Sequence, residues 1–148
     1  DGGAQLEVDP GVHLLLTEDS QMLNTAIFLM RSSSWSLDLL QRVWGPGDSP
    51  FVSHTWWEQA AFAQELLGKN HRLFAQPFAE GMQPLPYPPE VRVVPQFEIN
   101  SYHPISCRSD EAWRRGRFVL SFNGAQSLSG PMVARVLHAN YYELFCQL

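Results

Sequence analysis

Short apolar runs separated by polar and turn-forming residues mark the strands that the sequence predicts. The compact run at 12–16 has the length of a buried strand, and the run at 23–31 indicates another, with a polar loop at 17–21 between them. Residues 117–122 alternate between apolar and polar side chains, which is typical of a strand with one exposed face. Shorter strands are predicted at 5–8, 71–78, 91–94 and 97–102.

Apolar residues at helical spacing predict a first helix within 32–47. Ser33 or Ser34 can cap its start by accepting hydrogen bonds from the free backbone amides, and the glycines and proline at 45–47 predict its end. We expect its apolar face to consist of Trp35, Leu39, Leu40, Val43 and Trp44.

A second helix is predicted from Thr55, because Thr55 and Glu58 have the spacing of a capping box, and Gly68 predicts its end. The proline-rich segment 80–90 is expected to be a loop, and Pro131 is suited to begin a last helix. Because strands and helices alternate along the chain, we expect an α/β layered domain.

Length and composition favour one folded domain or part of one over residues 1–148. The chain has 148 residues, 45% of them hydrophobic, with five Trp and nine Phe, which excludes a disordered chain. It begins with Asp, so we expect a piece of a longer protein. No apolar run approaches the roughly 18–20 residues of a membrane span, and no signal peptide is visible. No membrane contact is therefore predicted within this sequence.

Charge and the spacing of histidines and cysteines bear on nucleic-acid binding and on metal binding. The net charge is −5 and only residues 114–117 form a basic cluster, so nucleic-acid binding is not expected. The five histidines and two cysteines show no metal-ligand spacing. A disulfide between Cys107 and Cys146 stays open. The sequence therefore predicts no metal site of its own.

Polar residues frame the apolar strand at 23–31. Asn24 and Thr25 open it and Arg31 closes it, although polar groups are costly to bury unless they are paired. Two interpretations are open. These residues form turns and caps, or they line a site.

Four segments, taken in order, resemble a known family. They are Leu-Asn-Thr at 23–25 before a strand that ends in Arg, Trp-Glu-Gln at 57–59, Val-Pro-Gln with Asn-Ser-Tyr in 94–102, and Gly-Arg-Phe-Val-Leu-Ser-Phe-Asn-Gly-Ala at 116–125. Over residues 14–125 the chain resembles the C-terminal half of the galactosyl-, mannosyl- and xylosyltransferases of glycosyltransferase family 34. The order of the segments gives the resemblance its specificity.

The resemblance implies a GT-A fold and a retaining transfer of a hexosyl or pentosyl unit. The implied partners are a nucleotide-sugar donor and a glycan acceptor. It also implies manganese as cofactor of the parent enzyme and, in a eukaryote, a membrane-anchored parent in the Golgi lumen. The donor sugar, the acceptor, the linkage and the oligomeric state are not determined by the sequence.

By analogy with the family, roles can be assigned to individual side chains. Sugar hydroxyls need paired donors and acceptors, and a carboxylate such as Glu58 can stabilise positive charge at the anomeric carbon. Trp56 or Trp57 can offer an apolar face to a sugar ring. The catalytic candidates are Glu58 and Gln59, and the substrate-binding candidates are Asp19, Asn24, Thr25, Trp57, Ser121, Asn123 and Gly124.

Purely structural alternatives accompany these roles. Asn24 with Thr25 also fits a plain turn, and Glu58 also fits a helix cap with no further role. The two tryptophans also fit the core. Asn-Ser-Tyr at 100–102 is interpreted as structural, because its polar groups can satisfy the backbone at a strand end.

Three departures from the family pattern bear on activity. The Asp-x-Asp that holds the metal and diphosphate is missing, so we expect the nucleotide-binding half upstream. Ser121 stands in place of a metal-binding histidine, and a hydroxyl is a poorer ligand for a transition metal. Ala26 stands in place of a glycine. We therefore expect the isolated chain to be inactive, and the alternative to a transferase is an inactive, transferase-like module for binding or assembly.

Overall fold

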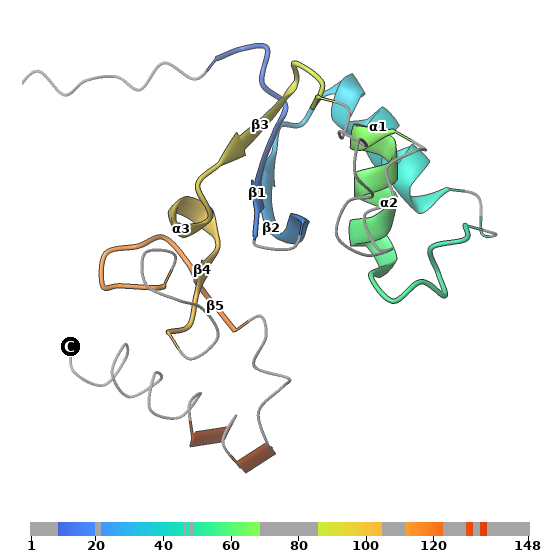
Figure 1. Cartoon of the computed structure of the whole chain (residues 1–148). Helices are drawn as coiled ribbons and strands as arrows, with labels where there is room; N and C mark the ends of the chain where they lie inside the picture. Colours follow the sequence, from blue (N-terminus) through green and yellow to red (C-terminus); the bar gives the residue numbers. More distant parts are fainter. Residues whose placement is uncertain are drawn as a thin grey trace, which may run out of the picture.

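The computed structural model describes residues 9–19, 22–45, 47, 49–68, 86–104 and 112–122, together with residues 130, 131, 134 and 135. Within them, helices accompany a small mixed sheet, which confirms the predicted α/β class (Figure 1). The segments predicted as strands at 5–8 and 71–78 lie outside the described residues. The same holds for Asn123, Gly124, Cys107 and Cys146.

The main sheet has three strands in the order β2-β1-β3. Strand β1 (Leu14–Glu18) pairs antiparallel with β2 (Leu23–Met30) and parallel with β3 (Val91–Val94). The polar loop predicted at 17–21 is wrong at its start, because Thr17 and Glu18 pair with the beginning of β2 and extend β1.

The pairing of β1 with β2 contains an irregularity at the N-terminal part of β2. Leu15 lies opposite Leu29, but Thr17 lies opposite Asn24, so a two-residue step in β1 faces a five-residue step in β2. Such a bulge leaves residues outside the ladder and bends the strand. The backbone amides of the residues that follow Asn24 are thereby free to bond elsewhere.

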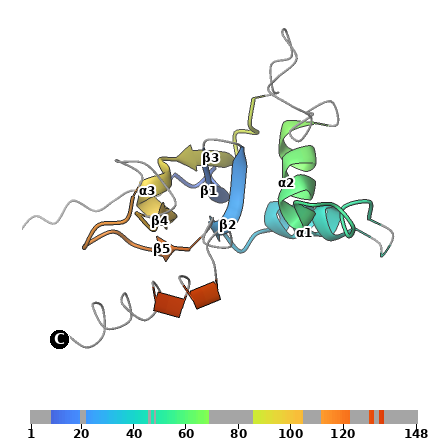
Figure 2. The ribbon, with the colours of Figure 1, turned by 60° about the horizontal axis from the view of Figure 1, so that its bottom comes forward.

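Two helices lie beside β2, on one side of the strands in both views (Figures 1 and 2). Helix α1 (Ser34–Trp44) begins after Ser33, whose hydroxyl accepts from the Ser36 amide, and ends at Gly45, as predicted. Helix α2 is Trp57–Leu67 and ends at Gly68. In the described part of the chain, no helix has the length and apolar character to span a membrane.

The core lies between these helices and the sheet. Phe62 on α2 is 1% exposed and packs its ring on Phe28, with 5.5 Å between ring centroids. The buried residues of this cluster are Leu14, Leu16, Leu23, Leu39, Val43, Ala61, Phe62, Leu66, Leu67 and Val91. Trp44 does not join the predicted apolar face, because it is 62% exposed at the end of α1.

A smaller unit follows β3 along the chain. The strand predicted at 97–102 is wrong over its first part, because Pro95 begins a one-turn helix, α3 (Gln96–Ile99). Strands β4 (Ser101–Tyr102) and β5 (Leu120–Ser121) then form a parallel pair. The strand predicted at 117–122 is reduced to β5, because its partner β4 is only two residues long.

The described start of the last predicted helix is helical. Gly130, Pro131, Ala134 and Arg135 all have helical conformation and are exposed. This agrees with a helix that begins near Pro131.

Candidate functional site

A partly buried group of polar side chains lies where β2, β4 and the end of β1 meet. We call it the Asn24 network, and it consists of Asp19, Asn24, Asn100 and Tyr102. Asn100 also donates to the Thr17 hydroxyl at 3.5 Å. The network joins residues up to 83 positions apart in sequence, so it depends on the tertiary fold.

Asn24 is the centre of this network and is 4% exposed. Its amide nitrogen donates to the Asp19 carboxylate at 2.9 Å and to the Tyr102 hydroxyl at 2.5 Å. Its amide oxygen accepts from the Ala26 amide at 2.9 Å and from the Asn100 side chain at 3.1 Å. An amide side chain offers two donors and one two-lone-pair acceptor, so Asn24 uses its full capacity.

The Asp19 carboxylate is held by donors on both oxygens. One oxygen accepts from the Met22 amide at 3.0 Å, and the other from Asn24 and from the Tyr102 hydroxyl, each at 2.9 Å. Hydrogen bonds to an ionised acceptor are stronger than those between neutral groups. They fix the position of this negative charge at the end of β1.

Thr25 connects the network to the start of α2. Its backbone amide, released from the ladder by the bulge, donates to the Gln59 side chain at 3.3 Å. Its hydroxyl donates to one Glu58 carboxylate oxygen, also at 3.3 Å. Among the described residues, no partner is recorded for the other carboxylate oxygen of Glu58, and the side chain is exposed.

Most of the sequence-predicted site residues are thus brought together. Asp19 and Asn24 form one hydrogen-bonded group, and Thr25, Glu58 and Gln59 form a second. The backbone step from Asn24 to Thr25 carries the connection from the network to α2. Asn123 and Gly124 lie outside the described residues.

Ser121 lies near this set. It is Tyr102's partner across the β4–β5 pair, is 7% exposed, and accepts a backbone bond from His103 at 2.9 Å. Ser121 is therefore one strand away from the Asn24 network.

The geometry decides the structural alternatives for Asn24 and Glu58. Asn24 is not a turn residue, because it lies within β2. The capping box is wrong, since α2 begins after Trp56 and no side chain caps it. Glu58 instead accepts from Thr25, on a different element.

The two tryptophans at the start of α2 do not belong to the core. Trp56 is 39% exposed and Trp57 64% exposed. Trp57 also has a φ of +34°, a conformation that is uncommon for a bulky residue and carries a cost of roughly 1–3 kcal/mol. The chain therefore turns sharply immediately before Glu58.

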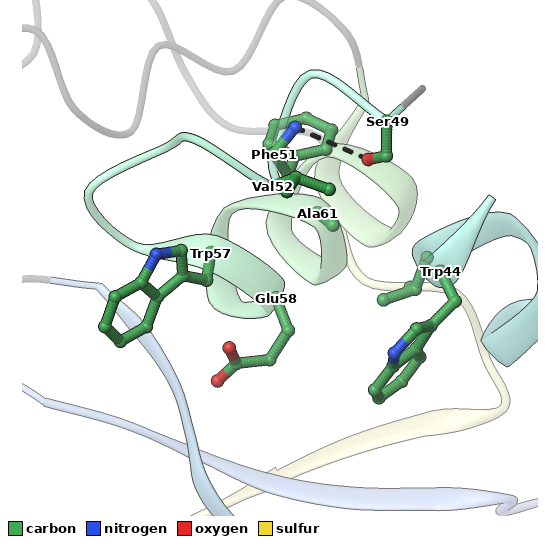
Figure 3. A pocket seen from close by; sticks show the side chains of 8 residues that line it. Trp44, Ser49, Phe51, Val52, Trp57, Glu58 and Ala61 are labelled. Atoms are coloured by element: carbon green, nitrogen blue, oxygen red, sulfur yellow. Dashed lines mark hydrogen bonds between the residues drawn. The ribbon is translucent and has the colours of Figure 1, made fainter. Parts of the chain in front are cut away.

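A pocket of about 350 Å³ opens between the end of α1, the turn that follows it and the start of α2 (Figure 3). Figure 3 shows the Glu58 carboxylate between the indoles of Trp44 and Trp57. The lining residues are Val43, Trp44, Ser49, Phe51, Val52, Trp57, Glu58 and Ala61. The pocket thus adjoins the Asn24 network through Glu58 and Thr25.

Tyr102 and Asn100 are members of the site that the sequence interpretation missed. Asn-Ser-Tyr was interpreted as structural, which holds for Ser101, whose hydroxyl donates to the Phe97 carbonyl at 2.8 Å. The available signal was the resemblance itself, since this tripeptide is one of its segments. Nothing in the local sequence indicates that Tyr102 reaches Asn24.

Gln96 is buried beside this region without satisfied hydrogen bonds. It is 4% exposed, and among the described residues neither its amide nitrogen nor its amide oxygen has a recorded hydrogen-bond partner. A buried amide without partners is destabilising by roughly 1–3 kcal/mol.

The pKa values of two ionisable side chains outside the network, Tyr87 and His103, differ from their ordinary values. Burial, reinforced by its 2.6 Å hydrogen bond to Glu18, raises the pKa of Tyr87 well above its ordinary value, so the phenol stays neutral. Burial lowers the pKa of His103, which stacks on Phe122 with 5.6 Å between ring centroids. Neither group lines the pocket.

Among the described residues, no cluster of three or more His, Cys, Asp or Glu side chains is placed to hold a metal ion.

Comparison with protein-family models, with curated proteins and with solved structures gave no match for this chain.

Proposed function

We propose that this chain is part of a retaining glycosyltransferase of the GT-A type, resembling family 34. It would move a hexosyl or pentosyl unit from a nucleotide sugar to a glycan. The observation that carries the proposal is that two hydrogen-bonded groups, Asp19 with Asn24 and Thr25 with Glu58 and Gln59, meet at adjacent residues of β2. These are the residues to which the resemblance assigns sugar binding and catalysis.

The residue types suit the chemistry of glycosyl transfer. A sugar leaving its nucleotide develops positive charge at the anomeric carbon, and a nearby carboxylate stabilises that charge. Glu58 has a carboxylate oxygen without a recorded partner among the described residues, while Thr25 holds the other. The fixed carboxylate of Asp19 and the amide of Gln59 supply acceptors and donors for sugar hydroxyls.

The described residues do not fit a manganese site. Ser121 offers a hydroxyl where the family has an imidazole, and hydroxyls are poorer ligands for transition metals. No described cluster of acidic or histidine side chains compensates for it. The proposal therefore contains no step through a metal, and any diphosphate binding belongs to the nucleotide-binding half that the resemblance predicts upstream.

The Ser121 departure favours one alternative function. A transferase-like module without metal ligands could serve binding or assembly, with the Asn24 network as a structural element. The Golgi location and the membrane-anchored parent stay predictions from the resemblance.

The test uses the longest native chain that carries this sequence. It is titrated calorimetrically with UDP-glucose, UDP-galactose, UDP-xylose and GDP-mannose, with and without manganese, and transfer to soluble glycans is assayed with the same donors. Saturable binding of one donor with transfer supports the enzyme. Binding of none of the four donors in either condition would reject it in favour of the inactive module.

Glu58→Gln tests the assigned residue. The amide oxygen can still accept from Thr25, so the fold should be retained while the charge is lost. We expect turnover to fall by about 100-fold or more with donor affinity unchanged. Glu65→Gln is the matched control, because Glu65 lies on the same helix and its carboxylate pairs with Arg42 at 2.9 Å on the surface, away from the pocket lining. Equal turnover in Glu58→Gln and wild type would remove Glu58 from the catalytic role.

A further inference from the structure

The pocket beside Glu58 combines features that are unusual for a surface hollow. Trp44 is 62% exposed, Trp57 64% and Val52 69%, so three large apolar side chains meet solvent around one cavity. Its volume of about 350 Å³ falls within the roughly 300–1,000 Å³ of small-molecule sites. Contiguous exposed apolar surface of this kind marks binding sites.

We propose that this pocket binds a pyranose ring of the glycan acceptor. The inference rests on the proposed function, because it takes the ligand to be the acceptor of that reaction. A pyranose presents C–H groups on its faces and hydroxyls around its edge. The indoles of Trp44 and Trp57 supply apolar walls for the faces, and the Glu58 carboxylate between them accepts from edge hydroxyls (Figure 3).

An ammonium ligand is the competing chemistry for this pocket. Cages for methylated ammonium groups place several ring faces around one small cation, and a carboxylate such as that of Glu58 would also attract the cation. Titration with tetramethylammonium therefore distinguishes this ligand from a sugar. Ser49 and Ala61 are the small residues of a lining that also contains Val43, Phe51 and Val52.

The position of the pocket suits an acceptor site. Glu58 lines it and also accepts from Thr25, the residue next to Asn24. A sugar held there would lie on the opposite side of Glu58 from the donor-binding candidates. Transfer requires donor and acceptor to be held side by side, and this geometry places both around one carboxylate.

The experiment measures glycan binding without any nucleotide sugar. The longest native chain is titrated with cellohexaose, mannohexaose and xylohexaose, followed by tryptophan fluorescence and calorimetry. We expect saturable binding of at least one, weakened about tenfold or more in Trp44→Ala and in Trp57→Ala. Leu37→Ala is the control, because Leu37 is 60% exposed on α1 and does not line the pocket. Circular dichroism verifies that each variant is folded.

The outcomes separate this inference from the proposed function. Glycan binding that needs both tryptophans, without transfer from any donor, supports the pocket and rejects the enzyme. Transfer that is unchanged in both tryptophan variants supports the enzyme and rejects the pocket. No saturable binding of the three glycans up to about 10 mM, or saturation by tetramethylammonium alone, would overturn the inference.

Discussion

Replacing Asn24 by Asp should destabilise the protein in a pH-dependent way. The substitution keeps the side-chain shape but replaces the donor nitrogen by a carboxylate oxygen. That oxygen would lie 2.9 Å from the Asp19 carboxylate, to which the nitrogen now donates. The Tyr102 hydroxyl has one proton, which it now donates to Asp19, so it cannot donate to the introduced group without releasing Asp19. Ala26 and Asn100 keep their acceptor. The net loss is therefore concentrated in the contacts with Asp19 and Tyr102.

The size of the loss follows from that contact. A hydrogen bond to a charged group contributes about 1.5–3 kcal/mol, and the variant replaces it by repulsion between two carboxylates. Because Asn24 is 4% exposed, solvent screens this repulsion little. We expect the free energy of unfolding to fall by about 3 kcal/mol near neutral pH.

The pH dependence has a definite sign. Repulsion raises the folded-state pKa of the carboxyl pair above the unfolded value of about 3.9. The folded variant then binds more protons than the unfolded chain between these two values, so its stability relative to wild type rises as the pH falls. The penalty is complete above the folded pKa and disappears below about pH 3.9.

Urea unfolding followed by tryptophan fluorescence measures this prediction at about pH 7.5 and about pH 5. The quantity compared is the difference in unfolding free energy between variant and wild type at each pH. Asn24→Ala is the control, because it loses the bonds to Asp19 and Tyr102, and those from Ala26 and Asn100 as well, without adding a titrating group. Its loss of stability should vary little with pH. A loss below about 1 kcal/mol near neutral pH, or an equal loss at both pH values, would contradict the network as described.

Two further substitutions test the packing around the site. Gln96→Met replaces a buried amide without partners by an apolar side chain of similar length, so the unfolding free energy should stay equal or rise by about 1 kcal/mol in urea titration; a clear decrease would mean that the amide has a partner. Ser33→Ala removes the hydroxyl that caps α1. This hydroxyl accepts from the Ser36 amide at 3.3 Å and lies 2.7 Å from a His13 ring nitrogen. The free energy of unfolding should therefore fall by about 1–2 kcal/mol. Its melting temperature should fall by several degrees, and an unchanged melting temperature would argue against the cap.

Local sequence signals predicted the main elements well. The length of the run at 23–31 and the serines before 34 correctly place β2 and the start of α1, because strand formation and capping depend on neighbouring residues. The one-turn helix at 96–99 was missed, since apolar residues in so short a segment fit a strand equally well. The capping box failed because Glu58 finds a partner on β2, which a local pattern does not contain.

The candidate site also contains residues that the sequence predicted and residues that it did not. The resemblance singled out Asp19, Asn24, Thr25, Glu58 and Gln59, and in the structure Asp19 bonds to Asn24 while Glu58 and Gln59 bond to the next residue, Thr25. Tyr102 joins them from 78 positions beyond Asn24, a distance at which spacing carries no information. The exposure of Trp44 depends on where the following turn lies, so the helical pattern alone assigned it to the core.

The bulge in β2 also affects how the sheet meets other chains. In the described part of the sheet, β2 is an edge strand of eight residues, and a straight edge of that length can pair with a strand of another molecule. The five-residue step breaks the regular spacing of its amides and carbonyls, and the Thr25 and Ala26 amides already bond to side chains. The irregularity that places the site residues therefore also guards this edge against intermolecular β-pairing, and shortening β2 to restore regular pairing should promote aggregation.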